Sequence, residues 1–215
     1  MIFGMKMRPL DRARRAAAWA PLACAGWLLA GSAWAAAPVF ELPELAALLA
    51  QKRNAEARFT EERFVSGLDA PLRASGTLSF NAPDRFVRQT LLPKAESMAV
   101  DGNQLTLQRA GRTRQMALDT VPELTALVEA VRGTLSGDVA RLQKYFRARV
   151  DGTATRWKLS LTPLDQRLGA QVRQLDIEGQ GPELRSIELL LSGGDRSVMS
   201  IEPAAPAATA AAVSK

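Results

Sequence analysis

Residues 157–162 read Trp-Lys-Leu-Ser-Leu-Thr, and this stretch decides the class of fold. Trp157, Leu159 and Leu161 alternate with polar residues, which is typical of an antiparallel strand with one apolar and one solvated face. Similar β-rich runs recur around it at a spacing of roughly ten residues. They cover residues 57–66, 72–80, 85–92, 96–100, 104–109, 112–118, 144–150, 155–161, 171–178, 183–191 and 196–201. The pattern predicts ten or eleven short antiparallel strands.

Turn dipeptides separate many of these runs. Asp101-Gly102, Asp151-Gly152 and Gly193-Gly194 favour tight hairpins, because these residue types tolerate a positive φ. Short connections favour the pairing of neighbouring strands. A sheet with this many strands has to curl or close on itself.

Two segments have helical rather than strand periodicity. Residues 43–52 place Leu45, Leu48 and Leu49 on one helical face. Residues 122–132 repeat the spacing with Leu124, Leu127, Val128 and Val131, and Gly133 is expected to end that helix. A further helical turn is expected over residues 137–143.

These elements together predict the architecture. Helices with one apolar face need an apolar surface to cover. We therefore expect a mainly β protein with helices (α+β), in which a strongly curved antiparallel sheet, or unclosed β-barrel, is capped on its concave side by the helices.

The first 35 residues have the pattern of a secretory signal peptide. Residues 1–15 carry five basic residues and one acid, residues 16–30 are uncharged, and Ala33 and Ala35 supply an A-x-A ending. We expect cleavage near Ala35; an uncleaved amphipathic anchor is the alternative. Cys24 is interpreted as part of the apolar signal core, and Arg14-Arg15 leaves Sec and twin-arginine export both open.

The predicted organisation has three parts. Residues 1–35 form the signal peptide, residues 36–203 form one domain, and residues 204–215 form a disordered tail rich in Ala and Pro.

Composition excludes several kinds of function. The 215-residue chain has no histidine and one cysteine, so it lacks the parts of a Ser-His-Asp triad, a cysteine zinc site or a CxxC redox pair. Its net charge of +6 depends on the signal peptide: removing five basic and one acidic residue from 28 and 22 leaves 23 and 21, or +2. A nearly neutral exported chain does not suggest a nucleic-acid partner.

No motif for catalysis is present. Glu61 and Glu62 are adjacent on a predicted strand, so they point to opposite faces and are interpreted as solvated. The chain has no nucleophile elbow, no P-loop and no dinucleotide fingerprint in the right context. We expect no catalytic residues, no metal and no cofactor, and a protein that is not an enzyme.

Basic residues gather in two groups. Solvated strand edges explain them, since charge there prevents sheets from associating. Contact with an acidic partner or with anionic head groups is the alternative. The groups are Arg109, Arg112 and Arg114, and Arg141, Lys144, Arg147 and Arg149.

Large apolar residues are spread over many of the predicted strands. They suit an ordinary core, and they also suit a cavity for an apolar ligand, since a curved sheet with only two short helices is hard to fill. The strand residues concerned are Phe59, Phe64, Leu78, Phe80, Phe86, Met98, Leu105, Leu107, Met116 and Trp157.

Several motifs taken together resemble a known family. They are ARFTEERF at 57–64, ASGTLSF at 74–80, PDRF at 83–86, VDGNQL at 100–105, WKL at 157–159 and GDRSVM at 194–199. The chain resembles the periplasmic outer-membrane lipoprotein carrier family (LolA), and more closely its divergent LolA-related branch. The resemblance covers the mature chain as far as Pro203.

The resemblance implies an unclosed β-barrel with a helical lid and a periplasmic location. It implies that acyl chains of lipoproteins lie between sheet and lid, and that the carrier takes them from an inner-membrane exporter to an outer-membrane acceptor. Membrane-side contacts are expected to be transient and the protein monomeric. The expected cargo-binding residues are Leu45, Leu48, Leu49, Phe59, Phe64, Leu78, Phe80, Phe86, Met98, Leu105, Leu107, Met116, Leu124, Leu127, Val128, Trp157 and Leu159.

One departure concerns the lid. The family has a basic residue, thought to hold the lid, just before the proline of the PDRF motif, where this chain has Ala82. We expect Arg85 to take over lid holding and release. A carrier of another lipid or lipid-linked product, an envelope module that binds proteins through its sheet edges, and an enzyme acting on lipids are the alternatives.

Overall fold

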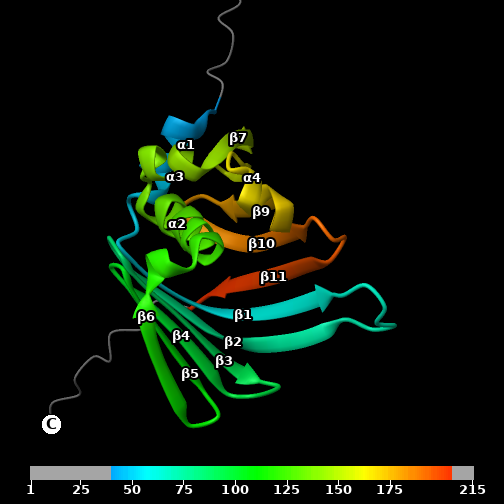
Figure 1. The fold of residues 1–215 in the computed structure, drawn as a ribbon. Helices are drawn as coiled ribbons and strands as arrows, with labels where there is room; N and C mark the ends of the chain where they lie inside the picture. The colour runs from blue at the N-terminus through cyan, green and yellow to red at the C-terminus, as the bar shows by residue number, and fades with distance from the viewer. Residues whose placement is uncertain (1–39, 205–215) are drawn as a thin grey trace, which may run out of the picture. The chain divides into compact units, whose positions relative to one another are not determined.

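The computed structural model describes residues 40–204, and one antiparallel sheet runs through them (Figure 1). The eleven strands follow the order β6-β5-β4-β3-β2-β1-β11-β10-β9-β8-β7. Their bounds are β1 Asn54–Phe64, β2 Leu72–Asn81, β3 Arg85–Leu92, β4 Glu96–Asp101, β5 Gln104–Arg109, β6 Arg112–Ala117, β7 Phe146–Thr153, β8 Arg156–Pro163, β9 Val172–Gln180, β10 Glu183–Leu191 and β11 Arg196–Pro203. The predicted number of strands is confirmed.

The topology is two meanders joined side by side. Strands β1 to β6 pair in sequence, β7 to β11 do the same, and β1 pairs with β11 with Phe64 opposite Arg196 and Ala57 opposite Pro203. Strands β6 and β7 are the two free edges, so the sheet curves without closing. The predicted unclosed, strongly curved sheet is thereby confirmed.

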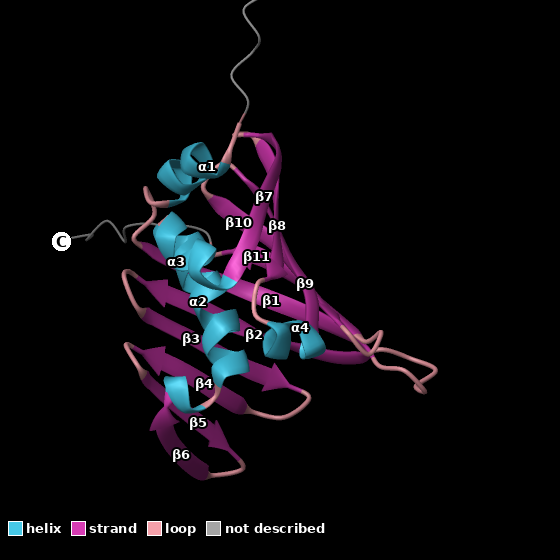
Figure 2. Cartoon of the chain, turned by 45° about the horizontal axis from the view of Figure 1, so that its top comes forward, coloured by secondary structure: helices cyan, strands magenta, loops and turns pink. Residues whose placement is uncertain are grey.

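The helices lie over one face of this sheet (Figure 2). They are α1 Leu42–Leu49, the 3-10 turn η1 Leu118–Thr120, α2 Pro122–Ser136, α3 Val139–Tyr145 and α4 Gln166–Gln171. The sequence pattern did not predict η1 or α4. Helix α4 starts at the N-cap Asp165, whose carboxylate accepts hydrogen bonds from the backbone N–H of Arg167 and Leu168.

Helix α2 is longer than predicted. Gly133 lies inside the helix, so the expectation that it ends the helix was wrong. The helix ends at Gly137, whose φ of 70° is left-handed, and whose backbone N–H donates to the carbonyls of Gly133 and Thr134. Asp138 then caps α3 by accepting from the backbone N–H of Arg141 at 3.0 Å. Residues 139–143 of the predicted turn lie in α3, whereas Gly137 and Asp138 are the caps between the two helices.

Two predicted segments fall outside this description. The signal peptide over residues 1–35 lies wholly outside the described residues, and so does the predicted tail over 204–215 apart from Ala204.

The first core fills the concave face over β7, β8, β9 and the neighbouring part of β10. Trp157 on β8 is 2% exposed, and its indole N–H donates to the carbonyl of Gly181 at 2.9 Å. Gly179 lets the indole approach β9 closely, because a Cβ there would come within 2.1 Å of the ring. Helices α1, α3 and α4 cover this region with Leu45 and Leu49, Leu142 and Leu168.

A second, smaller core fills the other end of the sheet. Val100, Leu105 and Leu118 are fully or almost fully buried there, together with Val128 of α2. Met98, Leu107, Met116 and Leu124 pack against them. The two cores leave the middle of the concave face between them.

Candidate functional site

The middle of the concave face is hollow. A cavity of about 1140 Å³ lies between α2 and strands β1, β2, β3, β4, β10 and β11. Ligand pockets for small molecules have volumes of roughly 300–1,000 Å³, so this space exceeds that range. It is large enough to hold a long flexible ligand rather than one ring.

The cavity wall is mainly apolar and comes from three parts of the chain. Alternation along each strand turns every second side chain inward, and α2 adds one apolar stripe. The wall contains Leu78 and Phe80 of β2, Phe86 of β3, Met98 of β4, Ile187, Leu189 and Leu191 of β10, Met199 and Ile201 of β11, and Leu124, Leu127, Val128, Val131 and Leu135 of α2.

Part of the predicted cargo-binding set lies in this wall. Strands β2 to β4 and helices α1 and α2 contribute these residues. They are Leu49, Leu78, Phe80, Phe86, Met98, Leu124, Leu127 and Val128.

The structure places the rest of the predicted set elsewhere. Leu45, Leu48, Trp157 and Leu159 belong to the first core, and Leu105, Leu107 and Met116 belong to the second. Phe59 is 1% exposed beneath Arg88, and Phe64 lies at the end of β1 with the Arg196 guanidinium 4.6 Å from its ring centre. The physical reason is that helices pack against both ends of the sheet and bury the residues there. The cavity remains only over the middle of the sheet.

Sequence reasoning missed the wall residues of β10 and β11. Ile187, Leu189 and Leu191 alternate along β10, and Met199 and Ile201 do so along β11. Both strands were predicted, and their apolar alternation already indicated which side chains turn inward. The alternation does not predict that β11 pairs with β1, and this pairing brings the residues opposite α2.

A charged cluster interrupts the apolar wall. Glu61 of β1 was interpreted as solvated, and this was wrong: it is 6% exposed, while its neighbour Glu62 faces the other side and pairs with Arg73. The Glu61 carboxylate accepts hydrogen bonds from Ser197 Oγ at 2.6 Å, from Arg63 at 3.4 Å and from Arg88 Nη2. The alternation of side chains along β1 turns the Glu61 carboxylate into the cavity. Hydrogen-bond donors on the neighbouring strands compensate for its burial.

The environment of Glu61 lowers its pKa below the usual value. Burial acts in the opposite direction and raises it, but the Ser197 hydrogen bond and the charges of Arg88 and Arg63 outweigh burial. Glu61 is therefore an anion at neutral pH, inside a largely apolar cavity.

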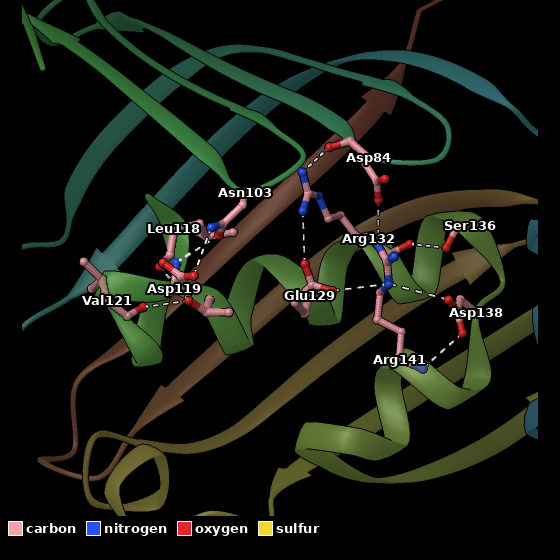
Figure 3. A network of polar contacts seen from close by, with 11 residues as sticks. Asp84, Asn103, Leu118, Asp119, Val121, Glu129, Arg132, Ser136, Asp138 and Arg141 are labelled. Carbon is pink, nitrogen blue, oxygen red and sulfur yellow. Dashed lines mark hydrogen bonds and ion pairs between the residues drawn. The ribbon is translucent and has the colours of Figure 1, made fainter. Parts of the chain in front are cut away.

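A second polar network holds α2 and α3, which we call the lid helices, to the sheet (Figure 3). Asp84, in the β2–β3 turn, accepts from Arg141 Nη1 at 2.8 Å with its carboxylate and from Arg132 Nη2 with its backbone carbonyl. Glu129 pairs with Arg132 at 3.0 Å and with Arg141 at 3.2 Å. We call Asp84, Glu129, Arg132 and Arg141 the lid network.

The lid network changes the role expected of Arg85. The side chain of Arg85 is exposed and makes no hydrogen bond or ion pair within residues 40–204, so its predicted contact with the lid is not formed. Its neighbour Asp84 makes the contact, and the arginines come from α2 and α3. Arg141 was grouped with solvated basic residues, yet the Asp84 hydrogen bond and nearby carboxylates raise its pKa above the usual value despite partial burial.

The start of α2 is anchored separately. The Asn103 side chain in the β4–β5 turn donates to the Asp119 carboxylate at 3.0 Å and accepts from the Asp119 backbone N–H at 3.1 Å (Figure 3). Helix α2 is thus tied to the sheet through polar contacts near both ends. Its apolar face between them looks onto the cavity.

Other kinds of site find no support in the part of the chain described. Within residues 40–204, no group of three or more acidic, histidine or cysteine side chains is placed to hold a metal ion. No helix in that range combines the length and apolarity needed to cross a membrane.

Comparison with known proteins identifies the family. The family model described as outer membrane lipoprotein carrier protein LolA-like matches residues 30–215. A search of curated proteins returns no match.

Solved structures with a similar fold were also found. A LolA superfamily protein from Nitrosomonas europaea has 10% identity, with 75% of this chain and 90% of that chain covered and a TM-score of 0.41. A DUF1329 family protein from Desulfovibrio piger has 8% identity, the same coverages of 75% and 90%, and a TM-score of 0.39. LprF from Mycobacterium bovis has 13% identity over 80% of this chain and 96% of that chain, with a TM-score of 0.36.

The family match spans the sheet, the lid helices and the cavity between them, and the chain belongs to the LolA-like family of outer membrane lipoprotein carrier proteins.

Proposed function

We propose that this protein is an exported carrier that holds the acyl chains of lipoproteins in the cavity between α2 and the sheet. In this role it takes acylated cargo from an inner-membrane exporter to an outer-membrane acceptor, works in the periplasm as a monomer and catalyses no reaction. The observation that carries the proposal is the hollow itself: an apolar space of about 1140 Å³ lies between two well-filled cores.

The chemistry of the wall suits acyl chains. Each methylene group transferred from water into an apolar site contributes about 0.8 kcal/mol. Leu, Ile, Met and Val side chains on both sides of the cavity offer surface of this kind, without a fixed pattern of polar partners along its length. Such a wall accepts chains of different length and saturation, as a carrier of many cargoes requires.

Release needs the binding to be reversible. Several buried acyl chains would bind too tightly to leave a rigid, closed cavity. The lid network ties α2 and α3 to the sheet by ion pairs, of which the Arg141–Asp84 pair is partly exposed. Partly exposed pairs contribute only about 0–1 kcal/mol each, so an acceptor that disturbs them opens the lid at small cost.

The experiment is to recover the natural cargo. The full chain is exported to the periplasm, purified without detergent and studied by native mass spectrometry followed by lipid extraction. We expect acylated species bound to the wild type. Their absence from a folded protein would contradict the proposal, and recovery of a non-protein lipid alone would favour the alternative carrier function.

A matched pair of variants localises the cargo. Phe86→Glu puts a charge into the cavity wall, whereas Val87→Glu puts the same charge on the next residue of β3, which faces the other side of the sheet. We expect cargo to be lost from Phe86→Glu and kept by Val87→Glu. Recovery of equal amounts of cargo from the two folded variants would show that the cavity is not the binding site.

A further inference from the structure

Charge in the cavity is concentrated at one end. Arg63, Arg88, Arg196, Glu61 and Asp195 line the cavity toward the place where β1 ends and β11 begins, with Phe64 opposite Arg196. The opposite end has the Lys52–Glu183 pair, with 2.7 Å between the two charged atoms. Between the two ends, the wall under α2 is apolar.

Arg88 is the most enclosed of the three arginines at the charged end. Its side chain is 25% exposed, against 51% for Arg63 and 44% for Arg196. The guanidinium carbon lies 4.8 Å from the centre of the Phe59 ring, so the planar group is held against the cavity floor. Its Nη2 donates to Glu61, while its Nε is buried and makes no hydrogen bond.

The charges around Arg88 do not balance. Glu61 is the carboxylate for both Arg88 and Arg63, whereas Arg196 has its own partner in Glu188 at 3.4 Å. Two guanidinium groups thus share one carboxylate, so Arg63, Arg88 and Glu61 together carry one positive charge in excess. The Asp195 carboxylate at the same end accepts from the Ser66 backbone N–H at 2.8 Å and forms an ion pair with neither arginine. A guanidinium offers five N–H donors, more than this one carboxylate uses.

A purely hydrocarbon ligand would be a poor match for this end of the cavity. It would remove water from Arg88 and Arg63 without replacing the lost hydrogen bonds, and that is unfavourable. An anion placed there instead would form charge-assisted hydrogen bonds, the strongest class that these side chains make.

We propose that the cavity binds an amphiphile whose anionic group, a carboxylate or phosphate, lies against Arg88 and Arg63 while its acyl chain runs under α2. The inference rests on the proposed function, since it assumes that an acyl chain occupies the apolar part of the cavity. It adds that an acyl ligand with such an anionic group is selected over an uncharged one, and that Arg88 and Arg63 select it.

Matched amphiphiles test this directly. Oleate, oleyl phosphate, oleyl alcohol and oleylamine have the same tail and differ in charge, and each competes with an apolar fluorescent dye for the purified wild type below its aggregation concentration. Oleate and oleyl phosphate are expected to bind at least about tenfold more tightly than oleyl alcohol, the effect of one hydrogen bond to a charged group. Oleylamine is expected to bind most weakly.

The triple variant Glu61→Gln/Arg63→Gln/Arg88→Met is the informative change. It removes all three charges of the cluster, so that no buried carboxylate loses its main partner and neither Arg63 nor Arg88 is left to bind an anion. The advantage of the two anions over oleyl alcohol is expected to fall to less than about threefold, while oleyl alcohol binds as well as before or better. If the triple variant does not fold, Arg63→Gln at its half-exposed position carries the test, with anion binding alone weakened about threefold.

The outcomes separate the two proposals. If none of the four amphiphiles displaces the dye, the proposed acyl-chain site is wrong. If all four bind equally well, or if the anion advantage survives unchanged in the variants, acyl binding stands and the anionic subsite at Arg88 is overturned.

Discussion

The region around Trp157 and the region around Leu78 lie on the same face of the same sheet, yet one is solid and the other hollow. Trp157 is 2% exposed and belongs to the core cluster to which all four α-helices contribute side chains. Leu78 faces α2 across a cavity of about 1140 Å³. Both residues belong to strands with the same apolar alternation, so the difference comes from what lies opposite. An inward-facing apolar residue makes a core only where another element comes close enough to touch it.

The largest expected effect is on stability, and it separates the two regions. Trp157→Ala leaves a void in a sealed core and is expected to destabilise the protein by about 3–5 kcal/mol. Leu78→Ala removes a side chain that packs only partly against the first core and otherwise faces the cavity, so it is expected to cost less, about 1–2 kcal/mol. Urea unfolding of both variants measures this. Similar losses for the two would mean that the middle of the sheet is as well packed as its end.

Filling the hollow is the next largest test. Met199→Trp enlarges a wall residue and takes space from about two methylene groups of a bound chain, so acyl binding is expected to weaken about tenfold. The fold is expected to be retained, because the added ring enters a cavity instead of a packed core. Dye displacement measures the affinity. Val198→Trp, one residue away on the opposite face of β11, serves as the control and should bind normally.

Loosening the lid is expected to have a smaller, kinetic effect. Asp84→Ala removes the carboxylate that binds Arg141 but keeps the backbone carbonyl that binds Arg132. The loss of one partly exposed pair is expected to speed dye entry and release about two- to fivefold in stopped-flow measurements. Arg85→Ala should change neither rate. A larger effect from Arg85 would restore the lid role that sequence reasoning gave it.

The smallest effect is a dependence of stability on pH. The pKa of Glu61 is lower in the folded protein than its usual value of 4.5, so its contribution is present above that value and is lost as the pH falls through the folded pKa. In Glu61→Gln, the free energy of unfolding should therefore fall less steeply as the pH is lowered, as measured by urea unfolding between neutral and acid pH. An unchanged pH dependence would show that Glu61 is not held as an anion.

Most of the fold could be predicted from the alternation of apolar and polar residues and from the residue types at the turns. The bounds of β3, β5 and β10 coincide with the predicted runs, and the free edges at β6 and β7 follow from pairing neighbours along the chain. Helix α4 was not predicted, because a segment of six residues is too short to show helical periodicity. Helix α2 was cut short at Gly133 because composition alone does not show which of two nearby glycines takes the left-handed conformation.

The candidate site was harder to predict than the fold. Periodicity shows that Leu105 and Met98 turn inward, but not that one is sealed by η1 and α2 while the other reaches the cavity. Glu61 looked solvated because its partners, Arg88 and Ser197, are distant in sequence and meet it only through strand pairing. The lid network likewise joins a β-turn to two helices across 48 and 57 residues.

The central claim is that the hollow between the two cores holds an acyl chain, and a crystal structure with a labelled ligand tests it most directly. A fatty acid with bromine at its methyl end is bound to the protein, and the anomalous signal locates the bromine. We predict the signal between the helices and the sheet, beside Leu49 and Leu184 at the end of the cavity away from Arg63 and Arg88. A signal on the outer face of the sheet, or a cavity closed by its own side chains with no ligand inside, would contradict the claim.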